Sequence, residues 1–125
     1  MIRAVDFDST LAYFDEKNMG EYAPDKLGAP VVKMLNRVKS WLKAGDEVVI
    51  LTARVHPSHG LSDVARAEKA IKAWCLKYLG QELEVTCMKS PKFREIWDDK
   101  AVRVRRNTGE LDFYDEWTVD LGAFL

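Results

Sequence analysis

The stretch Glu47-Val-Val-Ile-Leu-Thr52 limits the possible folds of this chain more than any other segment. It is short and almost wholly apolar between Glu47 and Thr52. Such a run is typical of a strand that is buried on both faces, as in a parallel sheet covered by helices. The segment therefore predicts an α/β domain with a mostly parallel sheet.

Helical patterns lie on both sides of this strand. Apolar residues recur at helical spacing over residues 30–44, with Pro30 at the start and Gly45 after the end. A second helix is predicted with Ser62 as its N-terminal cap and Gly80 at its end. The other predicted elements are a buried strand over 2–7, a strand over 84–88, a helical turn over 91–95, a half-buried strand over 101–105 and a turn over 107–109.

This order of elements predicts one three-layer, Rossmann-like domain over residues 1–125, with a core of about residues 1–105 and a tail over 106–125. Residues 13–28 are predicted to form a loop. No apolar run approaches the roughly 20 residues of a membrane helix, so no membrane partner is expected. Asp6 and Asp8 interrupt any signal peptide, and the two cysteines lack metal-ligand spacing, so we expect a cytoplasmic protein.

Polar side chains stand at the carboxyl ends of the predicted strands over 2–7, 47–52 and 84–88, and an acidic pair follows the apolar residues Ile96-Trp97. These residues are Asp6, Asp8, Thr10, Thr52, Lys89, Asp98 and Asp99. Open α/β sheets bind ligands outside the carboxyl ends of their strands. A lone Asp-x-Asp is more often a polar turn than a site, but the recurrence at several strand ends favours a functional site.

The residue types point to phosphate chemistry. If Asp6, Asp8 and one of Asp98 or Asp99 converge, their oxygens suit Mg²⁺, which would neutralise the acids and attract a phosphate. A lysine and a threonine hydroxyl nearby could hold the phosphoryl oxygens. One carboxylate could attack phosphorus, while a second could serve as general acid and base.

This pattern resembles the haloacid dehalogenase (HAD) superfamily of phosphotransferases. The first motif of that family, Asp-x-Asp-x-Thr, matches Asp6-Phe-Asp8-Ser-Thr10, and an apolar strand that ends in Thr or Ser matches the one ending at Thr52. The lysine of the third motif matches Lys89, and the late acidic pair matches Asp98-Asp99. The chain also looks like the small HAD-like proteins of bacteriophages and prophages.

The resemblance implies a role for each of these residues. Asp6 would be the nucleophile and a metal ligand, and Asp8 the general acid/base with its backbone carbonyl on the metal. Thr52 and Lys89 would hold the phosphoryl group, with Lys92 and Lys100 as competitors for the lysine role. Asp98 would complete the Mg²⁺ site, supported by Asp99. Thr10 is expected to contact the substrate. The position of Arg54 in the sequence is equally consistent with a contact to the leaving group and with a plain surface arginine.

The segments after Thr10 and Thr52 leave no room for the cap domain that many members of this superfamily insert. The resemblance therefore implies a capless phosphatase with an open site. An open site suits a bulky phosphorylated substrate such as a nucleic-acid end or a protein. It also suits a small phosphoester, including a nucleotide, if a neighbouring subunit of a homo-oligomer supplies the lid.

Other interpretations compete with this one. A phosphoacceptor signalling domain uses similar residues, but its acceptor Asp follows a middle strand, whereas here that strand ends in Thr52. A non-catalytic phosphate- or metal-binding module of the same fold is the main alternative. His56 and His59 flank a proline without a third ligand, which favours a structural role. The basic residues Arg103, Arg105 and Arg106 are consistent either with a nucleic-acid contact or with an edge strand.

Overall fold

A computed structural model describes residues 1–15 and 23–112 of the 125-residue chain. Its helices and strands, in chain order, are β1 (Ile2–Val5), α1 (Val32–Lys43), β2 (Glu47–Leu51), α2 (Leu61–Leu79), β3 (Glu84–Thr86) and β4 (Phe93–Trp97). Two 3-10 turns, η2 (Ala53–Val55) and η3 (Pro57–His59), connect β2 to α2. Most of the predicted tail, residues 113–125, lies outside the described residues, as do residues 16–22 of the predicted loop.

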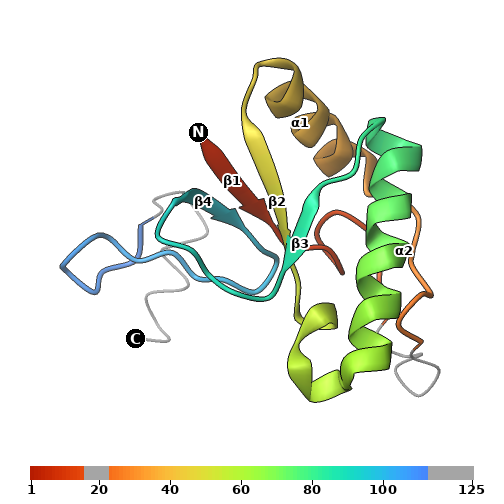
Figure 1. The fold of residues 1–125 in the computed structure, drawn as a ribbon. Coiled ribbons are helices and arrows are strands. Elements are labelled where there is room, and N and C mark those ends of the chain that lie inside the picture. The colour runs from red at the N-terminus through yellow and green to blue at the C-terminus, as the bar shows by residue number, and fades with distance from the viewer. Residues whose placement is uncertain (16–22, 113–125) are drawn as a thin grey trace.

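The four strands form one parallel sheet in the order β3-β2-β1-β4. Val49 and Ile96 flank Ala4 in the register of the three adjoining strands. Because all strands run the same way, their carboxyl ends share one edge, and Figure 1 shows them running toward a common region. The α/β class with a parallel sheet is confirmed.

Both helices pack into a single hydrophobic core. Side chains alternate along a strand, so Val5, Val48, Ile50 and Val85 share one face of the sheet. These four residues belong to the same buried cluster as residues of α1, such as Val38, and of α2, such as Ile71. The predicted three-layer arrangement is thus not confirmed, since α1 and α2 join one core in the described residues.

The predicted helices form with small changes at their ends. α1 begins two residues after Pro30, and Gly45, with φ of 91°, follows it in a conformation that favours glycine. The prediction of Ser62 as the cap of α2 is wrong, because α2 begins at Leu61 and Gly60 stands at the cap position without a side-chain hydrogen bond. Gly80 ends α2 in the left-handed conformation, as predicted.

The predictions for residues 91–105 need correction. Residues 93–97 are strand β4 and not part of a helical turn over 91–95. The predicted strand over 101–105 does not form: Val102 and Val104 are exposed, and only Val104 makes an isolated bridge, to Leu111. β4 is the last strand of the sheet, and residues 101–105 do not pair with it. Alternation alone therefore did not produce a strand.

A stack of aromatic and basic side chains holds the edge strand β4. The Trp97 ring lies 5.0 Å from that of Trp41 on α1, and the Arg3 guanidinium lies 4.6 Å from the Trp41 ring. Glu95 accepts hydrogen bonds from Arg3 (2.6 Å) and from the Trp97 indole (3.2 Å). Each such pair adds a modest stabilisation. Together they fix the strand that leads directly into Asp98.

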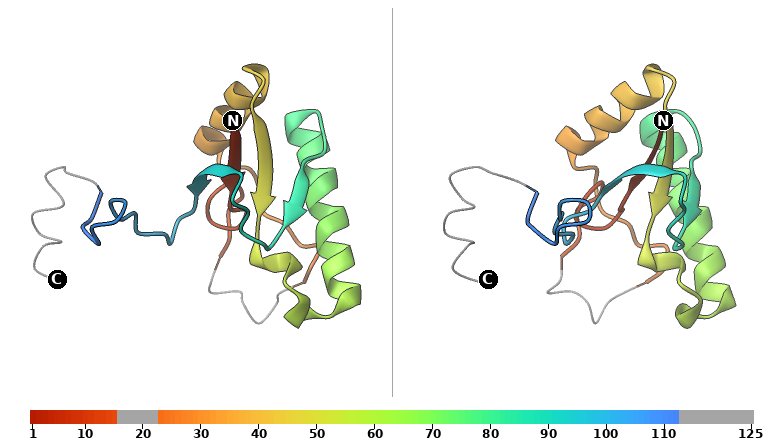
Figure 2. Two further views of the ribbon diagram at one scale, coloured as in Figure 1. Left: turned by 60° about the vertical axis from the view of Figure 1, so that its left-hand side comes forward. Right: turned by 90° about the vertical axis from the view of Figure 1, so that its left-hand side faces the viewer.

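Figure 2 shows two further features of the arrangement. Helix α2 runs beside β3, and the segment after β4 extends away from the sheet. Cys75 on α2 is fully buried in the core, and burial raises the pKa of its thiol to about 12. Within residues 1–15 and 23–112, no helix is long and apolar enough to cross a membrane.

Candidate functional site

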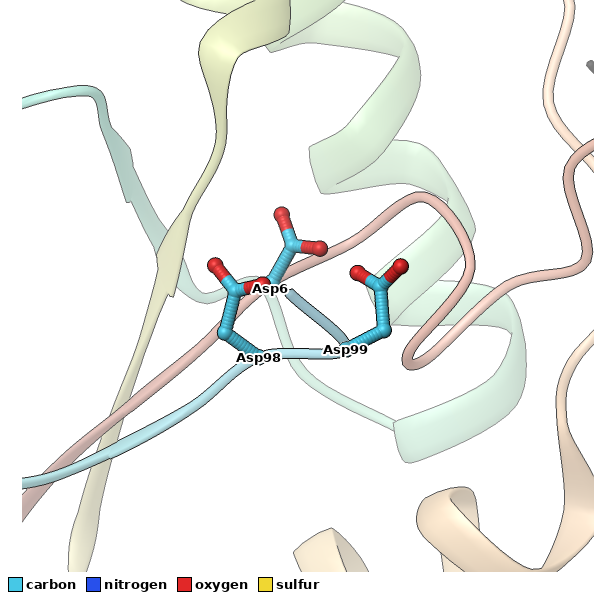
Figure 3. Close-up of side chains that lie close together, drawn as sticks. All are labelled: Asp6, Asp98 and Asp99. Carbon is cyan, nitrogen blue, oxygen red and sulfur yellow. The ribbon is translucent and has the colours of Figure 1, made fainter. Parts of the chain in front are cut away.

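Three carboxylates meet where the neighbouring strands β1 and β4 end. One carboxylate oxygen from each of Asp6, Asp98 and Asp99 lies within 4.8 Å of the others. Figure 3 shows these three side chains gathered at the ends of their strands. Asp6 follows β1 and Asp98 follows β4, and the Asp6 N–H donates to the Trp97 carbonyl at 2.8 Å. The predicted convergence of Asp6 with the late acidic pair is therefore present.

A tight turn after Asp6 places the next residues of the motif. The Phe7 carbonyl accepts from the backbone N–H groups of Leu11 and Ala12, both at 2.9 Å. Ser9 adopts φ of 68°, a conformation that is uncommon for a residue other than glycine. Phe7 itself is fully buried against Trp74, with ring centroids 4.9 Å apart. The turn is thus anchored in the core while its polar side chains face the strand ends.

Thr10 connects the two acidic segments. Its hydroxyl oxygen lies 3.3 Å from a carboxylate oxygen of Asp6 and 3.3 Å from one of Asp99, and it accepts from the Asp99 N–H at 3.1 Å. Because the hydroxyl has one proton, it can donate to only one of the two carboxylates at a time. The Asp98 carboxylate accepts from the Lys100 N–H at 2.8 Å, which shapes the turn after β4.

The grouping changes the protonation of Asp6. Partial burial, the charge of Asp98 and a hydrogen bond with Asp99 raise its pKa from 3.8 to about 7. Hydrogen bonds from the Phe7 backbone and from Thr10 act in the opposite direction. Carboxylates this close hold a proton, or attract a cation, to reduce their repulsion. A cation bound among the three carboxylates would favour the charged form of Asp6.

Asp8 does not join the three carboxylates but pairs with Arg54. The Arg54 Nε and Nη2 atoms donate to the two oxygens of Asp8 at 2.6 and 2.9 Å. Arg54 is buried, and its Nη1 also donates to the carbonyls of Ala23 and Pro24, both at 3.2 Å. Arg54 is thus a buried partner of Asp8 rather than a surface residue.

Thr52 lies at the carboxyl end of β2, as predicted, and is buried. Its hydroxyl oxygen caps η2 by accepting from the Arg54 N–H at 3.2 Å. Its own N–H donates to the Thr86 carbonyl at 2.8 Å. The hydroxyl retains its proton as a donor toward the cavity that it lines.

A cavity of about 560 Å³ lies over the strand ends. Its lining includes Asp6, Asp8, Thr52, Arg54, Asp98 and Asp99. Lys100 also lines it, whereas Lys89 is exposed and is not among the described residues that line it. The structure therefore gathers the predicted site residues with two exceptions. Lys89 lies outside the cavity, and Thr10 reaches it only through its contacts with Asp6 and Asp99.

The lining also includes residues that the sequence did not mark as functional. These are Ser9, Phe14, Leu51, Ala53, His56, His59 and Cys87. The His56 ring accepts from the Ser58 N–H at 3.1 Å within η3, in keeping with a structural role. Positions Phe14 and Cys87 carried no motif; only the fold brings them to this edge.

The donor set fits a divalent cation of the hard type. It offers three carboxylates, which supply oxygen ligands of the kind that Mg²⁺ binds while retaining some of its waters. Partial burial and the charge of Asp98 raise the pKa of Asp6, and a bound cation would favour its charged form. Among the described residues, the three acids are the one group of this composition.

Comparisons of the chain with protein-family models, with curated proteins and with solved structures found no match. Any functional conclusion must therefore rest on the chemistry of this site.

Proposed function

We propose that this protein is a Mg²⁺-dependent phosphohydrolase that cleaves a phosphomonoester through an aspartyl-phosphate on Asp6, on a capless, three-layer HAD-like domain. One observation carries the proposal: Asp6, Asp98 and Asp99 meet at the carboxyl edge of a parallel sheet, within a cavity that also contains basic and hydroxyl groups. This is the edge at which open α/β sheets bind their ligands.

Asp6, Asp98 and Asp99 would hold the metal. When bound, Mg²⁺ would offset the charge of the acids and of the phosphoryl oxygens, so that two anions can approach each other. Lys100 and the Thr52 hydroxyl line the same cavity and would bind the phosphoryl oxygens.

The residues would act in two steps. Before the first step, Asp8 would leave Arg54 and take up a proton from solvent. An Asp6 carboxylate oxygen then forms a bond to phosphorus while the bond from phosphorus to the leaving oxygen breaks, and the leaving oxygen takes that proton from Asp8. Asp8 then removes a proton from a water molecule, whose oxygen attacks phosphorus. The bond between phosphorus and Asp6 breaks, which releases inorganic phosphate and restores the carboxylate. Both acids line the cavity.

Arg54 controls the second carboxylate. Its two hydrogen bonds to Asp8 fix the orientation of the side chain. For Asp8 to pass a proton, one of its oxygens must give up its bond to Arg54 or turn toward the substrate. We infer that substrate binding loosens this pair.

The same pair favours the alternative function, a non-catalytic phosphate- or metal-binding module. Both oxygens of Asp8 accept short hydrogen bonds from Arg54, so an unused carboxylate would be stable in this position. Such a module would bind Mg²⁺ and a phosphate analogue at the three acids without turnover. Turnover separates the two functions.

The decisive experiment measures Mg²⁺-dependent release of phosphate from a panel of phosphomonoesters that includes nucleotides and 5′- and 3′-phosphorylated oligonucleotides. Wild type, Asp6→Asn and Asp63→Asn are compared; Asp63 is a half-buried acid in the first turn of α2 and is not among the residues lining the cavity. We expect activity in wild type and Asp63→Asn, and none in Asp6→Asn. Folded wild-type protein that binds Mg²⁺ but turns over no substrate would support the binding module instead.

A further inference from the structure

The basic residues of this chain are concentrated beside the candidate site. Residues 89–106 contain seven basic and three acidic residues, a formal net charge of +4, in a chain whose total is -1. Two of the three acids, Asp98 and Asp99, belong to the candidate metal site. We call residues 89–106 the basic segment. All seven of its basic residues are exposed: Lys89, Lys92, Arg94, Lys100, Arg103, Arg105 and Arg106.

The part of the basic segment that follows β4 begins beside the cavity and leads away from it. Lys100 lines the cavity and is bonded through its N–H to Asp98. Residues 101–106 follow without forming a strand and stay exposed. Figures 1 and 2 show this part of the chain extending outward from the end of β4. A ligand that followed it would arrive with its end at the three acids.

Arg103 and Arg105 share an acidic partner, Asp112. Arg103 contacts Asp112 at 2.9 Å and Arg105 contacts the same carboxylate at 3.5 Å. One acid thus serves two arginines, and the Arg103 side chain is 81% exposed. Exposed ion pairs of this kind contribute little to stability. Phosphate groups of a ligand can therefore replace Asp112 at little cost.

We propose that the basic segment binds the sugar–phosphate backbone of single-stranded nucleic acid, with the terminal phosphate of the strand in the cavity. A single small phosphoester would need only the basic groups inside the cavity. A row of exposed basic residues leading to the cavity matches a ligand with repeated negative charges along its length. The placement of the terminal phosphate in the cavity rests on the proposed function. The contact between the basic segment and the sugar–phosphate backbone does not rest on it.

The test measures binding separately from catalysis. The ligand is a fluorescent single-stranded DNA of about 12 nucleotides, within the usual range of single-strand sites. It carries a 5′-hydroxyl, so it offers no terminal phosphate there. Fluorescence anisotropy in Mg²⁺ buffer compares wild type, the variant Arg103→Gln/Arg105→Gln/Arg106→Gln, and the matched control Lys33→Gln/Lys39→Gln/Lys43→Gln. The control removes the same charge from exposed positions of α1.

We expect wild type and the α1 control to bind with similar affinity and similar dependence on salt. The arginine variant should lose at least about tenfold in affinity, equally for different sequences, because backbone contacts carry no sequence information. The slope of log affinity against log salt should fall by about 2, since each phosphate contact on a single strand contributes about 0.7.

The inference would be overturned by no binding of the oligonucleotide to folded wild type, or by equal losses in the arginine variant and the α1 control. Binding of a poly-glutamate peptide in place of the oligonucleotide would point to an acidic protein partner and equally refute it. If wild type binds DNA but releases phosphate from none of the 5′- or 3′-phosphorylated forms, the proposed function fails while the backbone contact stands.

Discussion

Asp8 and Arg54 form a two-point ion pair between segments that are 46 residues apart in the sequence, with contacts of 2.6 and 2.9 Å. Arg54 is buried, and its third nitrogen donates to the carbonyls of Ala23 and Pro24. One guanidinium therefore ties together the turn after β1, the turn after β2 and the chain that leads to α1. The stability of the fold and the geometry of the site depend on the same side chain.

We predict that Arg54→Gln destabilises the protein by about 3 kcal/mol, because it leaves Asp8 without its cation in a partly buried position. The matched control is Arg66→Gln, which removes a pair with Asp25 in which both side chains are 52% exposed. That change should cost less than about 1 kcal/mol. Urea denaturation measures both, and equal small losses would show that the buried pair adds no net stability.

Arg54→Lys should not restore the wild-type properties. A lysine keeps the charge but is a point donor, so it cannot span both oxygens of Asp8 and also reach two carbonyls. We expect intermediate stability, and phosphatase activity much closer to that of Arg54→Gln than to wild type. Full activity in Arg54→Lys would mean that only the charge of Arg54 matters.

The pKa of Asp6 predicts how metal binding depends on pH. Because its pKa is raised from 3.8 to about 7, the folded, metal-free protein keeps this proton longer than the unfolded chain does. The Asp6 carboxyl therefore lowers the stability of the folded, metal-free protein least below about pH 4. This stability falls as the pH rises from there through about 7. Mg²⁺ must displace the proton, so its affinity should rise about tenfold per pH unit up to about pH 7 and then level off.

Thermal melts with and without Mg²⁺ at about pH 5 and about pH 8 measure this effect. The increase in Tm caused by Mg²⁺ should be larger at the higher pH. Asp6→Asn should remove the increase and, without metal, should melt above wild type at the higher pH, because it relieves the repulsion with Asp98. A Mg²⁺ effect that is independent of pH, or that persists in Asp6→Asn, would contradict the assignment of the metal site.

The position of the lysines predicts which of them serves the site. The sequence favoured Lys89, but it is Lys100 that lines the cavity. We expect Lys100→Met to lower kcat/KM by about 100-fold, as loss of one positioned donor does, and Lys89→Met to have little effect. Steady-state kinetics on the best substrate of the panel decide between them. The reverse result would restore the original assignment to Lys89.

Gly28 supports the turn that carries Asp8 and Thr10. A Cβ at this position would overlap the carbonyl oxygen of Tyr13, where the two segments pass side by side. The neighbouring bridge between Ala12 and Pro30 and the hydrogen bond from the Tyr13 N–H to the Ala29 carbonyl (2.9 Å) hold the segments in place. We therefore expect Gly28→Ala to cost about 2 kcal/mol.

The control for Gly28 is Ala29→Ser, a small change at the adjacent exposed position, which should stay within about 0.5 kcal/mol of wild type. Urea denaturation again gives both values. Mg²⁺ binding should weaken in Gly28→Ala as well, because the displaced segment supports the turn beside Asp6. Wild-type stability in Gly28→Ala would show that the segment from Tyr13 to Gly28 can shift without affecting the turn.

Strong local patterns were enough to predict much of the fold. The apolar run of β2 and the helical spacing in α1 and α2 predicted the right elements. A strand that is buried on both faces is apolar throughout, and a helix that is buried on one side has apolar residues at helical spacing. The position of β4 was predicted wrongly because its polar and apolar residues do not follow its two faces. Glu95 lies on the face of Val5 and pairs with Arg3, whereas Ile96 is exposed on the other face. Its apolar residues therefore do not alternate.

The sequence by itself determined which chemistry could gather at the strand ends, because side chains that follow parallel strands must emerge at one edge. It placed Asp6, Thr52, Asp98 and Asp99 there without any long-range information. Only the tertiary structure decided how they are grouped. Asp8 pairs with Arg54, and Lys100 rather than Lys89 lines the cavity. These two contacts depend on the strand order and on turns that bring distant segments within hydrogen-bonding distance. No local sequence pattern encodes either of these.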